Sequence, residues 1–111
     1  MQTQLEITDL PVAPLDAAAD FHARYLPQAR DLLGDVESLV LILPPAERAH
    51  QGWRLAVVQE LARAAAPDRR VNAIIGDDQA AIQQTLTWLS GAPGITGQLL
   101  GVDGNLSDSP A

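Results

Sequence analysis

The run Leu39-Val40-Leu41-Ile42-Leu43 is the strongest structural signal in this chain. Five consecutive apolar residues, ended by Pro44 and Pro45, are typical of a strand that is buried on both faces. Such a strand lies in the interior of a parallel sheet, where helices cover both sides and connect one strand to the next. We therefore expect strands and helices to alternate on either side of this run.

Three further segments have the pattern of strands. Residues 5–8 alternate apolar and polar side chains, which predicts an edge strand with one face in water. Residues 71–75 and 98–102 supply two more apolar segments. The four strands predict an α/β, Rossmann-like, three-layer fold of the form β-α-β-α-β-α-β, with a small parallel sheet in sequential order and right-handed connections. The exposed edge strand invites pairing with another chain.

Three helices are predicted between these strands. The first covers residues 15–33, and Pro27 should kink or split it near Tyr25. The second covers residues 46–66, with Pro45 placed to open it. The third begins at a cap formed by residue 77 or 78, although this aspartate pair could instead be a chemical carboxylate pair. The predicted buried faces contain Leu15, Ala18, Ala19, His22, Leu26, Ala29 and Leu33 in the first helix, Ala49, Trp53, Ala56, Val57, Leu61 and Ala64 in the second, and Ile82, Leu86 and Leu89 in the third.

Length and composition narrow the class of protein. The 111 residues suit one compact domain, which we place at residues 1–104, with a flexible tail at residues 105–111. The chain has no cysteine, and all seven basic residues are arginine, so a thiol site and a catalytic lysine are excluded. The net charge of −7 argues against nucleic-acid binding. Without a signal peptide or an apolar segment that could span a membrane, we expect a cytoplasmic protein.

Two motifs give the sequence a family resemblance. Residues 70–74 read Arg-Val-Asn-Ala-Ile, while residues 95–98 and 102–104 read Ile-Thr-Gly-Gln and Val-Asp-Gly. In this order they resemble the strand after the active-site helix and the C-terminal signature of the short-chain dehydrogenase/reductase family. Residues 55–62 and 85–90 resemble two helices of that family. The likeness covers roughly residues 15–104 and implies the C-terminal half of the Rossmann-type fold in a truncated, catalytically degenerate member.

The resemblance also identifies chemical groups that the chain lacks. Reductases of this family use a tyrosine and a lysine four residues later, and these positions match Leu43 and Glu47 here. The family's serine position falls at about Pro44 or Pro45, and the only tyrosine, Tyr25, lies in another predicted helix. No strand is followed by the glycine-rich turn that holds a pyrophosphate. We therefore expect a pseudoenzyme with no cofactor and no catalytic, cofactor-binding or metal-binding residue.

Histidines and carboxylates leave one alternative open. His22 and His50 are the only imidazoles, and with Asp20 or Glu47 they could form a metal or acid–base site. His50 and Glu47 are three residues apart and would share one face of a helix. The two histidines lie in different predicted helices, so the sequence does not fix their separation. Ordinary surface or interface histidines are the favoured interpretation.

The surviving helices favour an association function. In relatives, the helices that match residues 15–33 and 46–66 pack against the same pair of a neighbour, so the resemblance implies a homodimer through helix pairs. The first hypothesis is thus a non-catalytic domain that acts through self-association or by binding a protein partner such as a full-length reductase. We expect core packing for Trp53 and Trp88, with an interface anchor as the alternative. The predicted interface residues are His50, Trp53, Val57 and Leu61.

The second hypothesis is a small-ligand-binding domain without redox activity. The carboxyl ends of the strands, near residues 44–45 and 76–78, would form a shallow crevice. This crevice could accept part of a nucleotide or an acyl group. No membrane partner is expected.

Overall fold

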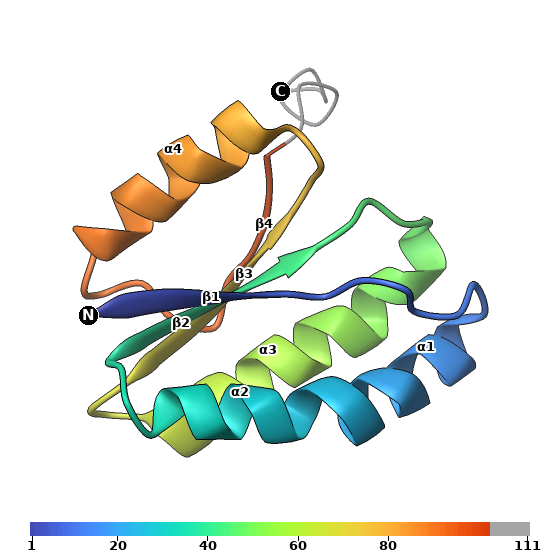
Figure 1. Ribbon diagram of the computed structural model, residues 1–111, viewed down its shortest axis with the longest axis horizontal. Helices are drawn as coiled ribbons and strands as arrows, with labels where there is room; N and C mark the ends of the chain where they lie inside the picture. Colours follow the sequence, from blue (N-terminus) through green and yellow to red (C-terminus); the bar gives the residue numbers. More distant parts are fainter. Residues whose placement is uncertain (103–111) are drawn as a thin grey trace.

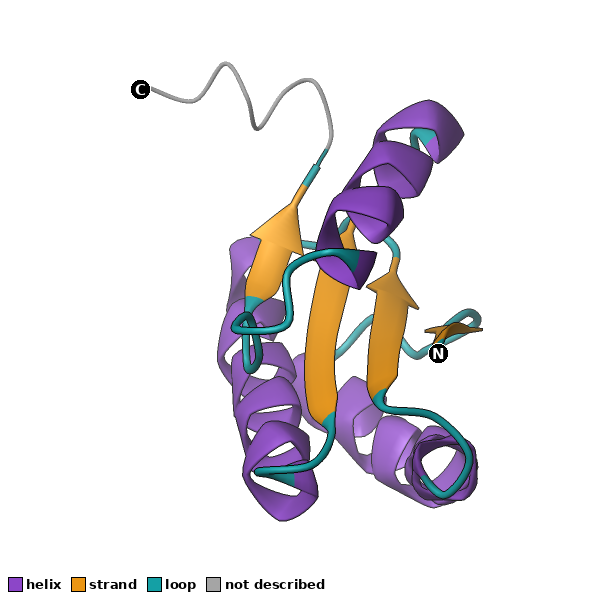
Figure 2. Ribbon diagram, turned by 90° about the vertical axis from the view of Figure 1, so that its left-hand side faces the viewer, coloured by secondary structure: helices purple, strands orange, loops and turns teal. Residues whose placement is uncertain are grey.

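A computed structural model describes residues 1–102 of the chain. Its strands are β1 (Gln2–Glu6), β2 (Ser38–Leu43), β3 (Arg70–Ile75) and β4 (Leu99–Gly101). They form one parallel sheet in the order β1-β2-β3-β4, which confirms the predicted sequential topology and the edge position of β1 (Figure 2). The predicted tail and the domain boundary at residue 104 lie outside the described residues.

The helices form the two outer layers. On one face of the sheet lie α1 (Pro14–Asp20), the π-helical turn η1 (Phe21–Tyr25), α2 (Leu26–Leu33) and α3 (Gln51–Ala65), as Figure 1 shows. The other face carries α4 (Gln79–Ser90). A short 3-10 turn, η2 (Arg48–His50), leads into α3. The structure therefore has the three-layer, Rossmann-like α/β arrangement that the sequence predicted.

The central strand β2 divides the core into two parts. All six of its residues are buried, as expected for its unbroken apolar run. Leu39, Leu41 and Leu43 contribute to the cluster beneath α1, η1, α2 and α3. Val40 and Ile42 contribute to the cluster beneath α4. In α4 the buried residues are Ile82, Leu86 and Leu89, which confirms the face predicted for the third helix.

The first predicted helix is split, and its buried face differs from the prediction. The break near Tyr25 is confirmed, because η1 ends there and Pro27 lies in the first turn of α2. The π-helical turn widens the repeat, so residues four apart stay on one side across the break. Leu15 is 86 % exposed, and Ala19 and His22 are also exposed, contrary to the predicted stripe. The buried residues are Ala17, Phe21, Tyr25 and Ala29, of which Ala29 was predicted. Leu26 and Leu33, also predicted, are partly buried against the core.

The second predicted helix starts later than expected. Pro45 does not open it, because residues 44–47 are irregular and the first turn is η2. A 3-10 turn has three residues per turn, so it changes the phase of the helix that follows. Ala49, Ala56 and Ala64 are exposed, which corrects the predicted buried face at these three positions. The buried residues of α3 are Arg54, Val57, Val58, Leu61 and Ala62.

The strand ends also differ from the prediction. β1 begins at Gln2 rather than at residue 5, because the polar side chain of Gln2 finds partners on the face that α4 covers. Ser38 Oγ donates to Gln2 Oε1 at 3.0 Å, and Gln2 Nε2 donates to the Leu86 carbonyl at 2.9 Å. A search for apolar alternation does not detect the start of this strand, because Gln2 is polar. At the other edge of the sheet, β4 is shorter than the predicted segment.

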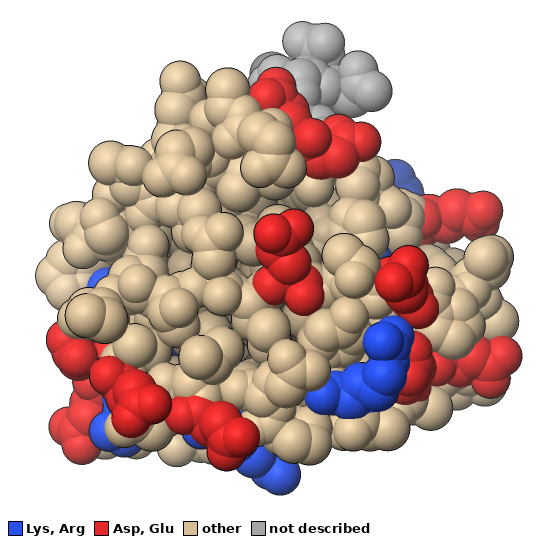
Figure 3. Space-filling model, in the orientation of Figure 1, with Lys and Arg blue, Asp and Glu red and all other residues tan. Residues whose placement is uncertain are grey.

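The surface agrees with the acidic composition. On the face drawn in Figure 3, acidic side chains are spread widely and the few basic ones lie beside them. Among residues 1–102, no helix has the length and apolar character needed to cross a membrane.

Candidate functional site

A cavity lies at the carboxyl ends of β3 and β4, beside the turn that starts α3. Its volume is about 470 Å³, and its lining includes Pro45, Glu47, Arg48, Arg54, Ile75 and Leu99. In open parallel sheets, ligands bind outside the carboxyl ends of the strands. A smaller cavity of about 290 Å³ shares Glu47 and Arg54 with the first one and is also lined by Asp9. Pro45 lines both cavities and Pro44 lines the smaller one, as the predicted crevice requires, whereas residues 76–78 line neither of them.

Arg54 is the most unusual charged group of this region. Only 4 % of the residue is exposed, and burial lowers the pKa of its guanidinium. Nη1 donates to the Pro44 carbonyl at 2.8 Å, and the guanidinium lies 5.8 Å from the centre of the Trp53 ring. Nε is buried without a hydrogen-bond partner. Among residues 1–102 no carboxylate forms an ion pair with Arg54.

The sequence analysis missed Arg54, although a local signal was present. Arg24 and Arg63 each have a carboxylate one helical turn earlier, at Asp20 and Glu60, and both pairs form ion pairs. Arg54 has no acidic residue three or four positions away on either side. An arginine on a helix without such a neighbour needs either solvent or a partner from elsewhere.

His50 is a buried structural residue beside this cavity. Its Nε2 lies 2.9 Å from the Val12 carbonyl, and its Nδ1 accepts a hydrogen bond from Trp53 Nε1 at 3.0 Å. Because an indole N–H only donates, Nδ1 must be the acceptor and Nε2 carries the hydrogen. Both ring nitrogens are thus occupied by contacts within the chain. Glu47, which the sequence placed with His50 on one helix face, instead precedes η2.

The other histidine, His22, lines neither of these two cavities. His22 lies exposed on η1, with Nδ1 2.7 Å from the Ala18 carbonyl. Within residues 1–102, no group of three His, Cys, Asp or Glu side chains is arranged to hold a metal ion.

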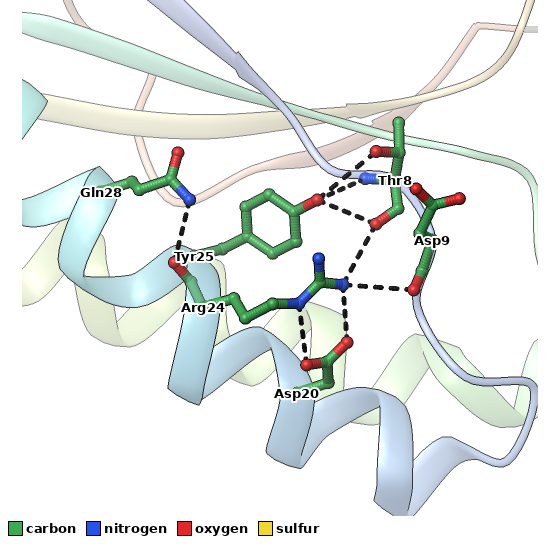
Figure 4. A network of polar contacts seen from close by, with 6 residues as sticks. All are labelled: Thr8, Asp9, Asp20, Arg24, Tyr25 and Gln28. Atoms are coloured by element: carbon green, nitrogen blue, oxygen red, sulfur yellow. Dashed lines mark hydrogen bonds and ion pairs between the residues drawn. The ribbon is translucent and has the colours of Figure 1, made fainter.

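The only tyrosine is part of a network that ties η1 to the end of β1 (Figure 4). The Tyr25 hydroxyl donates to the Thr8 carbonyl at 2.8 Å and accepts from the Thr8 backbone N–H at 3.0 Å. Arg24 donates to both carboxylate oxygens of Asp20, at 2.9 and 2.7 Å, and to the Asp9 carbonyl at 3.2 Å. Asp9 has a positive φ of 58°, so this contact holds a strained turn. Tyr25 is therefore committed to a structural role.

This network predicts an acid-sensitive contribution to stability. Hydrogen bonding from Arg24 holds the pKa of Asp20 below its usual value of 3.8. The contribution is fully present above that value and is lost as the pH falls through the lower pKa of the folded protein. The Asp20→Asn variant should therefore be less stable at neutral pH and should approach wild type below pH 3.8, in urea titrations at several pH values. The N-terminal amine also lowers the pKa of Glu37. Glu37 therefore contributes equally to the pH dependence of stability in wild type and in Asp20→Asn, and the difference between the two proteins reports on Asp20. A difference that stays constant with pH would contradict this assignment.

The motif residues of the family resemblance hold the loop before β4. Fully buried Asn72 donates from Nδ2 to the Ile95 carbonyl at 3.0 Å and accepts from the Gln98 N–H at 3.1 Å. Thr96 Oγ1 accepts from the Val71 N–H at 3.1 Å. Arg70 Nη1 donates to the Ala92 carbonyl at 2.9 Å. These contacts show how the described motif residues fix the loop before β4.

The positions aligned with catalytic groups carry no hydroxyl or amine. Leu43, aligned with the tyrosine, is buried at the end of β2, and Glu47, aligned with the lysine, is exposed. Pro44 and Pro45 occupy the serine position. Asp78 Oδ1 accepts from the N–H groups of Ala80 and Ala81 at 3.0 and 3.3 Å, which confirms the helix cap.

A second hollow, the α2–α3 groove, lies between these two helices on the outer surface. Its volume is about 630 Å³, and we define it by Leu26, Leu33, Trp53, Val57, Leu61 and Ala64. Three of the predicted interface residues thus share one surface: Val57 and Leu61 are buried, and Trp53 is half-buried. His50 does not line it.

The two tryptophans have different environments. Trp53 packs against the core, with its ring 5.8 Å from that of Phe21, as the core interpretation predicted. Trp88 is 55 % exposed on α4, so the core prediction is wrong for this residue. Trp88 lies on the exposed side of α4, whereas Leu86 and Leu89 are buried on the side of the helix that faces the sheet.

The fold and its loop contacts agree with the comparison with protein families. The family model of short chain dehydrogenase-like proteins matches residues 5–102. Searches of the curated proteins and of the solved structures gave no match. Because the family match covers most of the chain, and the motif residues that it includes build the loop before β4, this protein belongs to the short chain dehydrogenase-like family.

Proposed function

We propose that this chain is a non-catalytic short chain dehydrogenase-like domain that associates with a second copy of itself through the α2–α3 groove. The observation that carries the proposal is the groove itself, an open hollow of about 630 Å³ with a mainly apolar lining. Contiguous apolar surface of this kind marks interaction sites on soluble domains. A small domain gains stability by covering it.

The shape of α3 favours a two-fold arrangement. Large Trp53 lies near its first turn, and small, exposed Ala64 lies near its last turn, on the same groove. If two copies of α3 pack antiparallel, Trp53 of each copy meets Ala64 of the other. Such self-complementarity is what an isologous dimer requires. Two-fold dimers are also the commonest assemblies.

The charges around the groove fit the same arrangement. Arg30 and Arg69 line it together with Glu60. A groove with both signs of charge can pair with itself, because the arginines of one copy can face the glutamate of the other. These exposed charges contribute to orientation more than to affinity.

The absence of reductase chemistry supports a non-catalytic role. The chain contains no lysine, and its single tyrosine is committed to Thr8. The positions that the family uses for tyrosine and lysine hold Leu43 and Glu47. With these chemical groups absent, association through helix pairs is the family property that the α2–α3 groove still supports.

Ala64→Arg tests the groove directly. This exposed alanine lines the groove but makes no core contact in α3, so a long charged side chain should block association without unfolding the domain. The molar mass, measured by light scattering from micromolar to millimolar concentrations, should rise toward that of a dimer for wild type and stay monomeric for the variant. The dimer dissociation constant should rise by at least about tenfold.

Gln59→Arg is the matched control. Gln59 is exposed on the same helix but outside the groove, and the substitution adds the same side chain. It should retain the wild-type molar mass. Equal weakening by both variants would point to charge and not to the groove, and a monomeric wild type at every concentration would contradict self-association. In that case, the same pair of variants should be compared in binding to a full-length reductase, the other partner that the family suggests.

A further inference from the structure

The buried guanidinium of Arg54 lacks a negative partner within the part of the chain that the structure describes. The Pro44 carbonyl accepts from Nη1, but no carboxylate of residues 1–102 pairs with the charge, and Nε has no partner. Proteins bury charges where a counter-charge or a bound group compensates them. The position of Arg54 therefore indicates a place for an anion.

Two cavities meet at Arg54, and their charges differ. The smaller, of about 290 Å³, is lined by the carboxylates of Asp9 and Glu47, which disfavour an anion. The larger, of about 470 Å³, is lined by Arg48 and Arg54 against Glu47 alone. An anion that enters the larger cavity would meet an excess of positive charge. Its size lies within the range of pockets for small molecules.

The walls of the larger cavity indicate the class of anion. Ile75 and Leu99 supply an apolar side, while the arginines supply the charged side. A single excess positive charge matches a monoanion better than a phosphate dianion, whose second charge Glu47 would repel. We propose that this cavity binds a small organic carboxylate, with its charged group at Arg54 and its apolar body against Ile75 and Leu99.

A purely structural role is the competing explanation for Arg54. In that case the guanidinium only clamps the irregular segment after β2 through the Pro44 carbonyl and stacks on Trp53. Such a clamp would give no response that depends on an added anion. The two explanations thus separate on ligand titrations of the intact chain.

The test is an NMR titration of the ¹⁵N-labelled protein with hexanoate at constant ionic strength. The amide signals of Leu99 and Gly101 and the indole signal of Trp53 should shift in a saturable manner, because these groups lie in or next to the cavity wall. Hexanamide, which has the same shape without the charge, should give no such shifts. Acetate should bind more weakly than hexanoate, because it buries less apolar surface.

Three variants connect the response to the charges of the cavity. Arg54→Met replaces the buried charge with an apolar chain of similar length and should weaken hexanoate binding by at least about tenfold. Glu47→Gln removes the repulsive carboxylate and should tighten binding by about two- to fivefold. Arg63→Gln removes an equal charge from the exposed surface of α3, outside both cavities and the α2–α3 groove, and should leave affinity unchanged. Because Glu47→Gln predicts a gain, the test does not depend on Arg54→Met remaining folded.

Several results would overturn the proposal. They are the absence of saturable shifts with hexanoate, an equal response to hexanamide, unchanged affinity in folded Arg54→Met, and tighter binding of inorganic phosphate than of hexanoate. The last result would assign the cavity to phosphate groups instead. The readout is independent of molar mass, so failure here leaves self-association through the α2–α3 groove unaffected.

Discussion

Replacing Asn72 with leucine is expected to lower the free energy of unfolding by about 2–4 kcal/mol, because two buried polar groups lose their partners. Asn72 is fully buried, and its amide serves the Ile95 carbonyl and the Gln98 N–H. Leucine has a similar volume but can serve neither group. Urea-induced unfolding measures the loss, and hydrogen exchange should accelerate first at Gln98 and Leu99, next to the vacated contact.

Gln84→Leu provides the matched control for this change. It introduces the same apolar side chain in place of an amide, but at an exposed position of α4. Surface substitutions of this kind change stability by less than about 0.5 kcal/mol. If Asn72→Leu lowered the free energy of unfolding no more than Gln84→Leu, the contacts of Asn72 would not be what stabilises the loop before β4.

Phe21→Ala is expected to cost about 3–5 kcal/mol, the range for truncating a fully buried aromatic residue. Phe21 is 1 % exposed and lies in η1, where its ring stacks on Tyr25 at 6.0 Å and meets Trp53 at 5.8 Å. Removing it opens a cavity where η1 packs against α3. Urea unfolding measures the loss, and near-ultraviolet circular dichroism should show weaker packing around the aromatic residues.

Leu15→Ala is the control that separates the observed helix phase from the predicted one. The apolar spacing of the sequence placed Leu15 in the core, but the structure leaves it exposed on α1. Its removal should change the free energy of unfolding by less than about 0.5 kcal/mol. A loss comparable with that of Phe21→Ala would mean that the predicted phase was right and the π-helical phase wrong.

The sheet could be predicted from the sequence because its signals are local and strong. An apolar run such as that of residues 39–43 has no stable place except between two helical layers. Pro27 identified the helix break near Tyr25 for an equally local reason, because it lacks a backbone N–H. The sequential order followed from the alternation of elements and the shortness of their connections.

The helix faces could not be predicted with the same success. A regular period of 3.6 residues cannot follow a helix that contains a π-helical turn, and this shift moved Leu15 and His22 out of the core. The start of α3 shifted for a similar reason, because a 3-10 turn precedes it. A search for one regular helical period detects neither turn.

The candidate sites were predicted unevenly. Trp53, Val57 and Leu61 were identified together because they share one side of a helix, and the structure gathers them along the α2–α3 groove. His50 was predicted with them, whereas its contacts to Val12 and Trp53 turn it inward. The absence of acidic residues one helical turn from Arg54 was visible in the sequence, but its burial was not. Whether a charge has a partner depends on long-range contacts that spacing does not reveal.

The sequential order of the sheet has a consequence for how the chain folds during synthesis. Each strand pairs with the strand made just before it, so β2 meets β1, β3 meets β2 and β4 meets β3. No strand has to enter between two strands that are already paired. The sheet can therefore grow at one edge as the ribosome releases the chain, because each new strand pairs with a strand that has already been synthesised.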